Sequence, residues 1–364
     1  MPTTPDEITA FKNKIPILRD LIKEGHYDKA RLLRDDIDAI GKFTRDGHYE
    51  LSAYFNILDA KLLMVDGKHD AAFFILSNIR CGFSGFVVGN SEVLFQYHSA
   101  MGLYHMFTNE HALAIESIEK SLVIMKQLNI NNVSVYYNLA VCHTAIDKPV
   151  KAIALFETTR NMAVKSGSYL VNNFYDIDIA TNYSKLRQYD RAEEMLIKAL
   201  SSAKSAYSEL YTAMAYHALG SVYADTKRFD KAIVHFDLAS NYYDKTSFNY
   251  AKNLLDKSYA LIDAGEYSQA YKCIKQGLLE SGSFHRLNML FKSNAYLLNF
   301  SDQKALTFIE TTTIPDLLKA RKLLLAIRYC EFLVNYYMRV NDSDNAIIYS
   351  EMANTCYKKF LSEV

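Results

Sequence analysis

The 364-residue sequence predicts an all-α fold, a right-handed superhelical solenoid of about nine helix pairs. The first observation is an alanine that ends a tight-turn pattern and returns about every forty residues. Its clearest copies are 25–30 (GHYDKA), 187–192 (RQYDRA), 227–232 (KRFDKA) and 265–270 (GEYSQA), and weaker copies end at Ala72, Ala114, Ala152, Ala305 and Ala346. The second observation is that large and small residues recur at helical spacing on both sides of each turn. Such a period indicates stacked units that bury their core against one another.

Each period divides into two helical stretches, and the first of all is expected to start at Glu7 or soon after. In two clear copies a small residue, Ala180 or Gly220, lies one turn before a tyrosine on the first helix. Small residues there and at the recurring alanine let the two helices approach closely. The order small, tyrosine, eight-residue gap, alanine is the tetratricopeptide pattern. We expect one solenoid over residues 1–364, with no separate DNA-binding or catalytic domain.

Two segments interrupt the repeat. Residues 80–90 are rich in glycine and aromatic residues, and without a Gly-Lys-Ser/Thr sequence they are expected to form a connector and not a phosphate-binding loop. Residues 311–316 (TTTIPD) form the second break, where Pro315 is expected to open the following helix at its first position.

Composition and charge exclude several classes of function. The 41 basic residues balance the 41 acidic ones, so we expect no nucleic-acid or membrane partner. The sequence contains no apolar run long enough to cross a membrane and no leader, so a cytoplasmic location is expected. Cys81, Cys142, Cys273, Cys330 and Cys356 lie far apart, as is typical of buried free thiols. No metal, cofactor or catalytic constellation is visible, and we expect no enzyme.

The first helix of each repeat is expected to line the concave face of the solenoid, where a partner would bind. Polar and aromatic residues at the inward positions suit an extended peptide, because an amide both donates and accepts a backbone hydrogen bond. The candidate peptide-binding residues are Tyr137, Asn138, Asp178, Thr181, His217, Asp256, Tyr259, Asn294, Arg328 and Asn335, with Phe174 as a further aromatic wall. Taken singly, each polar residue is better explained by plain exposure to solvent, and the peptide interpretation depends on the set.

The chain resembles one bacterial family, the peptide-pheromone receptors of Gram-positive bacteria known as the Rap, NprR, PlcR, PrgX and Rgg group. Residues 136–143 (YYNLAVCH) look like the peptide-contacting helix of that family, and 54–61 (YFNILDAK) resemble a helix of its Rap branch. The resemblance implies a role in quorum sensing, with transcription regulation or sporulation as the output, and it implies that Asn138 holds a peptide backbone. The pair 48–49 (HY) stands where Rap phosphatases carry Asp-Gln, so phosphatase activity is not expected. Nine repeats without a preceding helix-turn-helix are most similar to an NprR-like repeat domain.

Three functions are compatible with the sequence. The first is a cytosolic receptor that binds a short peptide and thereby changes its interaction with a protein partner. The second is a general tetratricopeptide scaffold, and the third is a phosphatase or inhibitor directed at a response regulator. The partner is expected to be a response regulator or a second copy of the chain. Self-association is suggested by apolar residues on the last helix, namely Ala346, Ile347, Tyr349, Met352, Tyr357 and Phe360.

Overall fold

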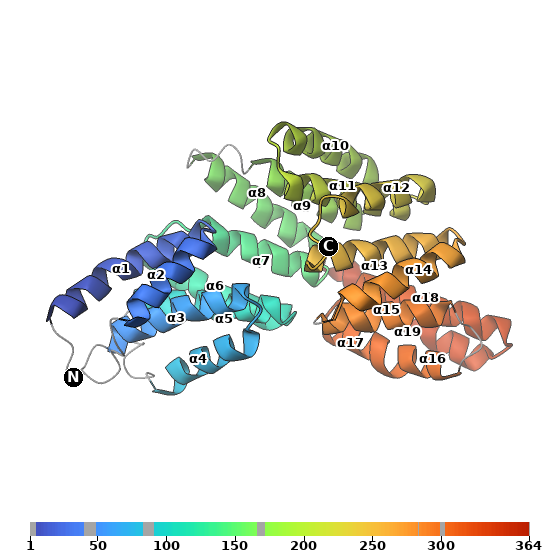
Figure 1. Ribbon diagram of the computed structural model, residues 1–364. Helices are drawn as coiled ribbons and strands as arrows, with labels where there is room; N and C mark the ends of the chain where they lie inside the picture. The colour runs from blue at the N-terminus through green and yellow to red at the C-terminus, as the bar shows by residue number, and fades with distance from the viewer. Residues whose placement is uncertain are drawn as a thin grey trace. The chain divides into compact units, whose positions relative to one another are not determined.

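The computed structural model describes residues 5–39, 49–82, 91–165, 172–282, 284–298 and 303–363, and every regular element in these ranges is a helix (Figure 1). The first helices of the repeats are α1 (Pro5–Lys23), α3 (Tyr49–Val65), α5 (Ser91–Phe107), α7 (Val133–Ala145), α9 (Asn172–Lys185), α11 (Glu209–Asp225), α13 (Phe248–Asp263), α15 (His285–Leu297) and α18 (Leu323–Arg339). The second helices are α2 (Tyr27–Ala39), α4 (His69–Gly82), α6 (His111–Gln127), α8 (Pro149–Lys165), α10 (Tyr189–Ser205), α12 (Phe229–Ser240), α14 (Tyr267–Glu280) and α19 (Ser343–Ser362). In the eighth repeat the second helix is replaced by α16 (Gln303–Phe308), a π-helical turn η4 (Ile309–Thr313) and α17 (Ile314–Lys319). The predicted all-α repeat fold is therefore confirmed.

Every recurring alanine predicted from the sequence lies at the same place in its repeat. Each is the third or fourth residue of the second helix, and each is buried, with an exposed fraction of 0 to 4%. At that depth a longer side chain would separate the paired helices, so alanine is required by the close approach. Gly220 serves the same purpose on a first helix, where its α-carbon lies against the buried ring of Phe236.

A left-handed residue reverses the chain between the two helices of most repeats. In the first repeat Gly25 adopts a φ of 77°, and the next amide, His26 N, donates to Leu21 O at 2.9 Å. This bond closes the end of the first helix in the manner of a Schellman motif. The same positive φ recurs at the matching turn positions Gly67, Asn109, Asp147, Arg187, Lys227, Gly265 and Asn341. The turn between paired helices therefore has the same backbone conformation in these repeats.

The helices divide into two compact units. Unit 1 is Met1–Cys142 and unit 2 is His143–Val364. The cores of unit 1 gather around Phe11 and Ile57, and the larger core of unit 2 includes the fully buried Phe291 and Tyr329. The expectation of a single solenoid over residues 1–364 stays a prediction.

Further sequence expectations concern the break at residues 311–316, the start of the first helix and the connector at residues 80–90. Pro315 is the second residue of α17, one position later than expected, and the π-helical turn η4 leads directly into that helix. Helix α1 begins at Pro5, slightly ahead of Glu7. Residues 83–90 of the connector and His48 lie outside the described residues, while Tyr49 opens α3.

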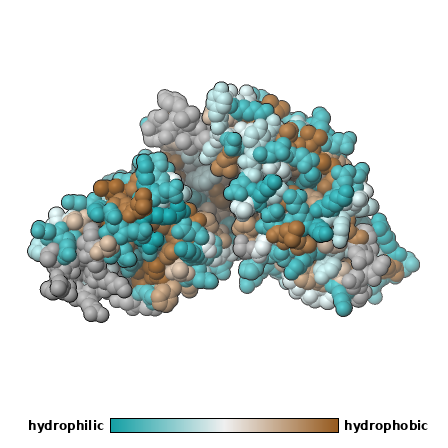
Figure 2. Space-filling view, in the orientation of Figure 1, coloured by the Kyte–Doolittle hydropathy of each residue, from teal (hydrophilic) through white to brown (hydrophobic). Residues whose placement is uncertain are grey.

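The cysteines whose side chains are described are free and buried, and the visible surface is mainly hydrophilic (Figure 2). Cys142, Cys273, Cys330 and Cys356 are free and buried, and burial raises the pKa of each thiol, whereas the side chain of Cys81 lies outside the described residues. The visible surface is mainly hydrophilic, with small hydrophobic patches (Figure 2). In the part of the chain that the structure describes, no helix is both long and apolar enough to cross a membrane.

The contact at Gly220 gives a test of the close approach. A Cβ at this position would lie 2.8 Å from two ring carbons of Phe236, so Gly220→Ala should lower the free energy of unfolding by about 1–2 kcal/mol even after the gain in helix propensity. Urea denaturation monitored by circular dichroism measures the change. Gly282→Ala is the control, because nothing lies within 4 Å of its added Cβ, and a change within about 0.5 kcal/mol is expected. Equal effects of the two substitutions would contradict the packing argument.

Candidate functional site

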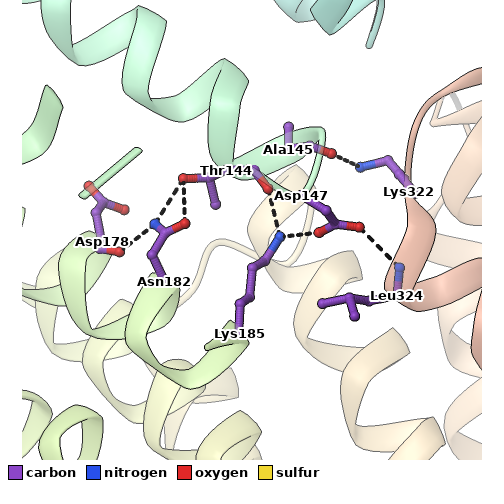
Figure 3. Close-up of polar contacts among 8 residues, drawn as sticks. All are labelled: Thr144, Ala145, Asp147, Asp178, Asn182, Lys185, Lys322 and Leu324. Atoms are coloured by element: carbon purple, nitrogen blue, oxygen red, sulfur yellow. Dashed lines mark hydrogen bonds and ion pairs between the residues drawn. The ribbon is translucent and has the colours of Figure 1, made fainter. Parts of the chain in front are cut away.

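Polar side chains connect successive first helices within unit 2. At the start of this series Asn182 on α9 is fully buried, and its Nδ2 donates to Thr144 Oγ1 on α7 at 2.9 Å (Figure 3). The same amide nitrogen donates to the backbone oxygen of Asp178 at 2.8 Å. These bonds satisfy a buried amide that would otherwise destabilise the helix contact. They also fix the orientation of α9 against the end of α7.

The series continues from α9 to α11 and from α11 to α13. Ser184 Oγ donates to Asp225 Oδ2 at 3.0 Å, and His217 Nε2 lies 2.8 Å from Asp256 Oδ2. Lys252, one turn before Asp256 on α13, forms an ion pair with the same carboxylate oxygen. One carboxylate therefore holds an imidazole and an ammonium group together on two neighbouring first helices.

The two carboxylates differ in their pKa. Desolvation by the surrounding protein raises the pKa of Asp225 to about 6 although the residue is exposed, and the Ser184 hydrogen bond partly offsets this effect whereas the charge of Asp256 reinforces it. Burial also acts to raise the pKa of Asp256, but the charges and hydrogen bonds of Lys252 and His217 outweigh it and hold that pKa well below its usual range. At neutral pH Asp256 is thus a neutralised anion, whereas Asp225 has no ion-pair partner of its own within 4.0 Å among the described residues.

Helix α18 joins the series through α13. Arg328 donates to Asp263 Oδ1 at 2.7 Å, and its guanidinium carbon lies 4.5 Å from the centroid of the Tyr259 ring. The hydroxyl of Tyr259 lies 3.1 Å from that of Tyr329, which is fully buried. We call this series of contacts between first helices the polar row; it consists of Thr144, Asn182, Ser184, Asp225, His217, Asp256, Asp263 and Arg328.

Asn294 is not available to a ligand, which corrects its prediction as a peptide-binding residue. Its side chain is fully buried, its Nδ2 donates to Ser258 Oγ at 2.8 Å, and its Oδ1 accepts from the Tyr329 hydroxyl at 3.0 Å. An amide placed this deeply supports helix packing, because both of its ends already have protein partners. Tyr259 is also buried, with 9% of its surface exposed, so it provides at most a small part of a binding surface.

The other residues predicted to bind a peptide range from half-buried to exposed. The structure brings His217 to Asp256 and Tyr259 to Arg328. The side chains of Tyr137, Asn138, Asp178 and Thr181 are half-buried, and that of Asn335 is exposed. The Thr181 hydroxyl donates to Ile177 O in its own helix at 2.9 Å. Phe174 lies in α9, and its side chain is outside the described residues.

Sequence reasoning missed a group of residues around the α7–α8 turn. Lys185 Nζ donates to Asp147 Oδ1 and to Thr144 O, both at 2.6 Å, while Asp147 Oδ2 accepts from the backbone amide of Leu324 at 3.1 Å (Figure 3). Lys322 Nζ lies 3.5 Å from Ala145 O. These contacts bring the start of α18 to the end of α7 within unit 2.

A signal for several of the missed contacts was present in the sequence. Asn182 follows Thr144 by 38 residues, and Lys185 follows Asp147 by the same number. Asp256 follows His217 by 39. Complementary polar residues one period apart are thus candidates for contact between neighbouring repeats. The contact between Asp147 and Leu324 spans 177 residues, and no such rule would have found it.

The fold places the protein in the class of tetratricopeptide-repeat solenoids. A family model described as tetratricopeptide repeat matches residues 174–245, which lie within unit 2. No curated protein matches the sequence.

Among solved structures the chain is similar to Rap and NprR proteins over nearly its whole length. A Rap protein complexed with Competence and Sporulation Factor aligns with a TM-score of 0.83 and 15% identity, covering 98% of this chain and 99% of that one. NprR in complex with its cognate peptide NprX gives a TM-score of 0.73 and 18% identity, covering 92% and 99%. The apo form of the quorum sensor NprR from B. thuringiensis gives 0.70 and 17%, covering 95% and 98%. At these identities the comparison confirms the expected likeness at the level of the fold.

The ion pairs of Asp256 predict a pH dependence of stability. Because the pKa of Asp256 is lower in the folded than in the unfolded protein, its stabilisation is fully present above the unfolded pKa and is lost as the pH falls toward the folded one. Asp256→Asn should lower the free energy of unfolding at pH 7 by about 2 kcal/mol. It should also flatten the loss of stability that urea denaturation detects between about pH 5 and pH 2.

Asp237→Asn is the matched control, because Asp237 pairs with Lys257 but is 57% exposed. Exposed pairs of this kind contribute little, so a change within about 0.5 kcal/mol is expected. A variant at Asp256 that behaved like this control at both pH extremes would show that the polar row does not stabilise unit 2.

Proposed function

We propose that this protein is a cytoplasmic receptor for a short signalling peptide, which binds along the first helices of unit 2 and changes how the protein interacts with a protein partner. The observation that carries the proposal is the polar row, which arranges hydrogen-bonding groups along successive first helices. Two solved proteins of similar fold are complexes with signalling molecules, namely Competence and Sporulation Factor and the peptide NprX. The groups of the row are bonded to one another, so the row fixes the spacing of the first helices. The partly exposed residues that these helices carry at that spacing suit an extended peptide, which presents a polar group at regular intervals.

Asp178, which lies on α9 beside the row, is the proposed contact for the peptide backbone. It is only partly covered by the protein and belongs to a first helix of unit 2. Partial burial favours binding, because the surrounding protein excludes water while the polar group remains accessible. His217, Asp256 and Arg328 are proposed to set the charge of the surface that a ligand meets further along. Thr181 and Asn335 complete the proposed set, whereas Tyr137 and Asn138 belong to unit 1 and stay predictions.

Selection from a peptide library tests the receptor proposal. We expect random heptapeptides displayed on phage to yield a family of related sequences on the immobilised full-length protein. A synthetic peptide of that family should bind at least about tenfold more weakly to Asp178→Ala by isothermal titration calorimetry, because the substitution removes a hydrogen-bonding group. Glu194→Gln is the control, since Glu194 lies on a second helix and is 68% exposed beside Lys198.

Each outcome distinguishes the receptor from its alternatives. Equal affinity of the wild type and Asp178→Ala would place the peptide elsewhere and contradict the proposed contact. Failure to enrich any peptide over an empty support would contradict the receptor itself and favour a general scaffold for protein assembly.

We further propose that a second copy of the chain covers the last repeat. In this repeat Met338, Ile347 and Ile348 are 61, 56 and 51% exposed. By contrast, Ala346 and Phe360 are buried against their own chain. The apolar residues that the sequence suggested for self-association are therefore only partly available for it. Adjacent exposed apolar residues favour association, because a second copy can bury them.

Sedimentation velocity tests the self-association. The double substitution Ile347→Lys and Ile348→Lys should shift the protein toward monomer at concentrations where the wild type is dimeric, because burying two ammonium groups opposes association. Leu279→Lys, which changes a leucine that is 76% exposed on α14, should leave the distribution unchanged. A wild-type protein that stays monomeric at high concentration would refute the proposal.

A further inference from the structure

The ends of two distant helices satisfy each other within unit 2. Helix α18 begins at Leu323 after Lys322, whose side chain provides no cap for the first amides of that helix. The amide of Leu324 is one of those unsatisfied donors, and Asp147 Oδ2 accepts from it at 3.1 Å. A carboxylate at this position also faces the partial positive charge of the helix N-terminus. Asp147 thus caps a helix that begins 176 residues after it in the sequence.

At the end of α7, lysine side chains contact the carbonyl oxygens of the last helical turn. The carbonyl groups of Thr144 and Ala145 belong to its last turn, where the helix leaves carbonyl oxygens without intrahelical partners. Lys185 Nζ donates to the first at 2.6 Å, and Lys322 Nζ lies 3.5 Å from the second. Cations at a helix C-terminus are stabilised by its partial negative charge. We call the contacts of Asp147, Lys185, Lys322 and Leu324 the closing contact.

A second ion pair joins the same two parts of unit 2. Lys148, the residue before α8, lies 2.6 Å from Glu363 at the end of the chain, and the two side chains are 14 and 24% exposed. The hydrogen bond from Lys148 is the main reason that the pKa of Glu363 is lowered. Because the polar row already connects α7 to α18 through α9, α11 and α13, these contacts complete a ring of polar interactions.

The closing contact contains repulsion as well as attraction. Lys185 and Lys322 approach adjacent carbonyl groups, so two ammonium groups lie close together. Burial and the charges of Lys185, Arg286 and Lys252 together lower the pKa of Lys322 to about 8, and the charge of Asp147 offsets only part of this effect. A buried charge cluster of mixed sign has a small net stability, because desolvation opposes the attraction between its members. A contact of small net stability can break while the helix pairs around it stay folded.

From this geometry we propose that the closing contact is a reversible latch, through which unit 2 exchanges between a closed ring and an opened row of intact helix pairs. The proposal concerns the protein without any ligand, so it goes beyond the receptor function and does not rest on it. The latch is formed by hydrogen bonds between helix ends and by ion pairs, whereas the helix pairs are held by their buried cores. Changes in charge should therefore open the latch without unfolding the repeats.

Distances between spin labels on the full-length protein test the latch. Labels at Ala154→Cys on α8 and Lys319→Cys on α17, both exposed positions, report the separation of the two sides of the closing contact. A background with Cys81→Ser and without the two introduced cysteines checks that the buried native thiols do not react. Double electron–electron resonance should give a main short distance and a minor longer one in the otherwise unchanged protein.

Two substitutions should increase the population at the longer distance. Asp147→Asn removes the charge, and asparagine tolerates the left-handed backbone at that position, where φ is 56°. Lys148→Met breaks the second ion pair independently. Each should raise the ratio of open to closed protein about tenfold. Lys198→Met, in an exposed pair on α10, is the control and should leave the ratio unchanged. Raising the salt concentration from about 0.05 to 1 M should shift the unmutated labelled protein in the same direction.

The outcomes decide the proposal in either direction. A longer distance that grows in the two variants and in high salt, with unchanged helical circular dichroism, supports the latch. Identical distance distributions under all these conditions would overturn it. If Asp147→Asn loses helical structure, the decision rests on Lys148→Met and on the salt series, and a loss of helix in these as well would show that the contact cannot open apart from unfolding.

Discussion

The close approach of two helices at a recurring alanine is the constraint on which the rest of this structure depends. Where the second helix carries alanine near its start, and where Gly220 meets Phe236, the paired helices lie near enough for one repeat to stack directly on the next. Stacking at a short and constant spacing brings equivalent positions of neighbouring first helices within hydrogen-bonding distance. The polar row is a result of that spacing, since its partners are separated by about one period in the sequence.

The repeat fold could be predicted from the sequence because its signals are local. The turn pattern before Ala192 and the small residue at Gly220 occur within a few residues of the contacts that require them. The candidate site was only partly predictable. His217 and Asp256 were chosen one by one for their helical register, and the structure brings them together. Asn294 was chosen by the same rule and is wrong, because register does not distinguish an amide facing solvent from one enclosed by α13 and α18. The contact of Asp147 with Leu324 depends on how the repeats curve over 177 residues, which no local pattern describes.

The polar row and the proposed latch give a ligand two ways to act on unit 2. A ligand moves an equilibrium between two conformations only by the difference in its affinity for them. A peptide held by Asp178 would contact α9, which also carries Lys185 of the closing contact. Such a ligand would be sensitive to the state of the latch because it shares that helix with it. An effect on the last repeat, where a second copy is proposed to bind, would then require no contact between the ligand and α19.

The ring of polar contacts also bears on how this protein can change over evolution. An open array of repeats gains or loses a unit with little consequence, because each unit touches only its neighbours. In unit 2 the insertion or deletion of one helix pair would carry the amide of Leu324 away from Asp147 and leave Glu363 without Lys148. The number of repeats between α7 and α18 is therefore expected to be fixed among descendants of this chain, while single residues on the outer helices remain free to vary.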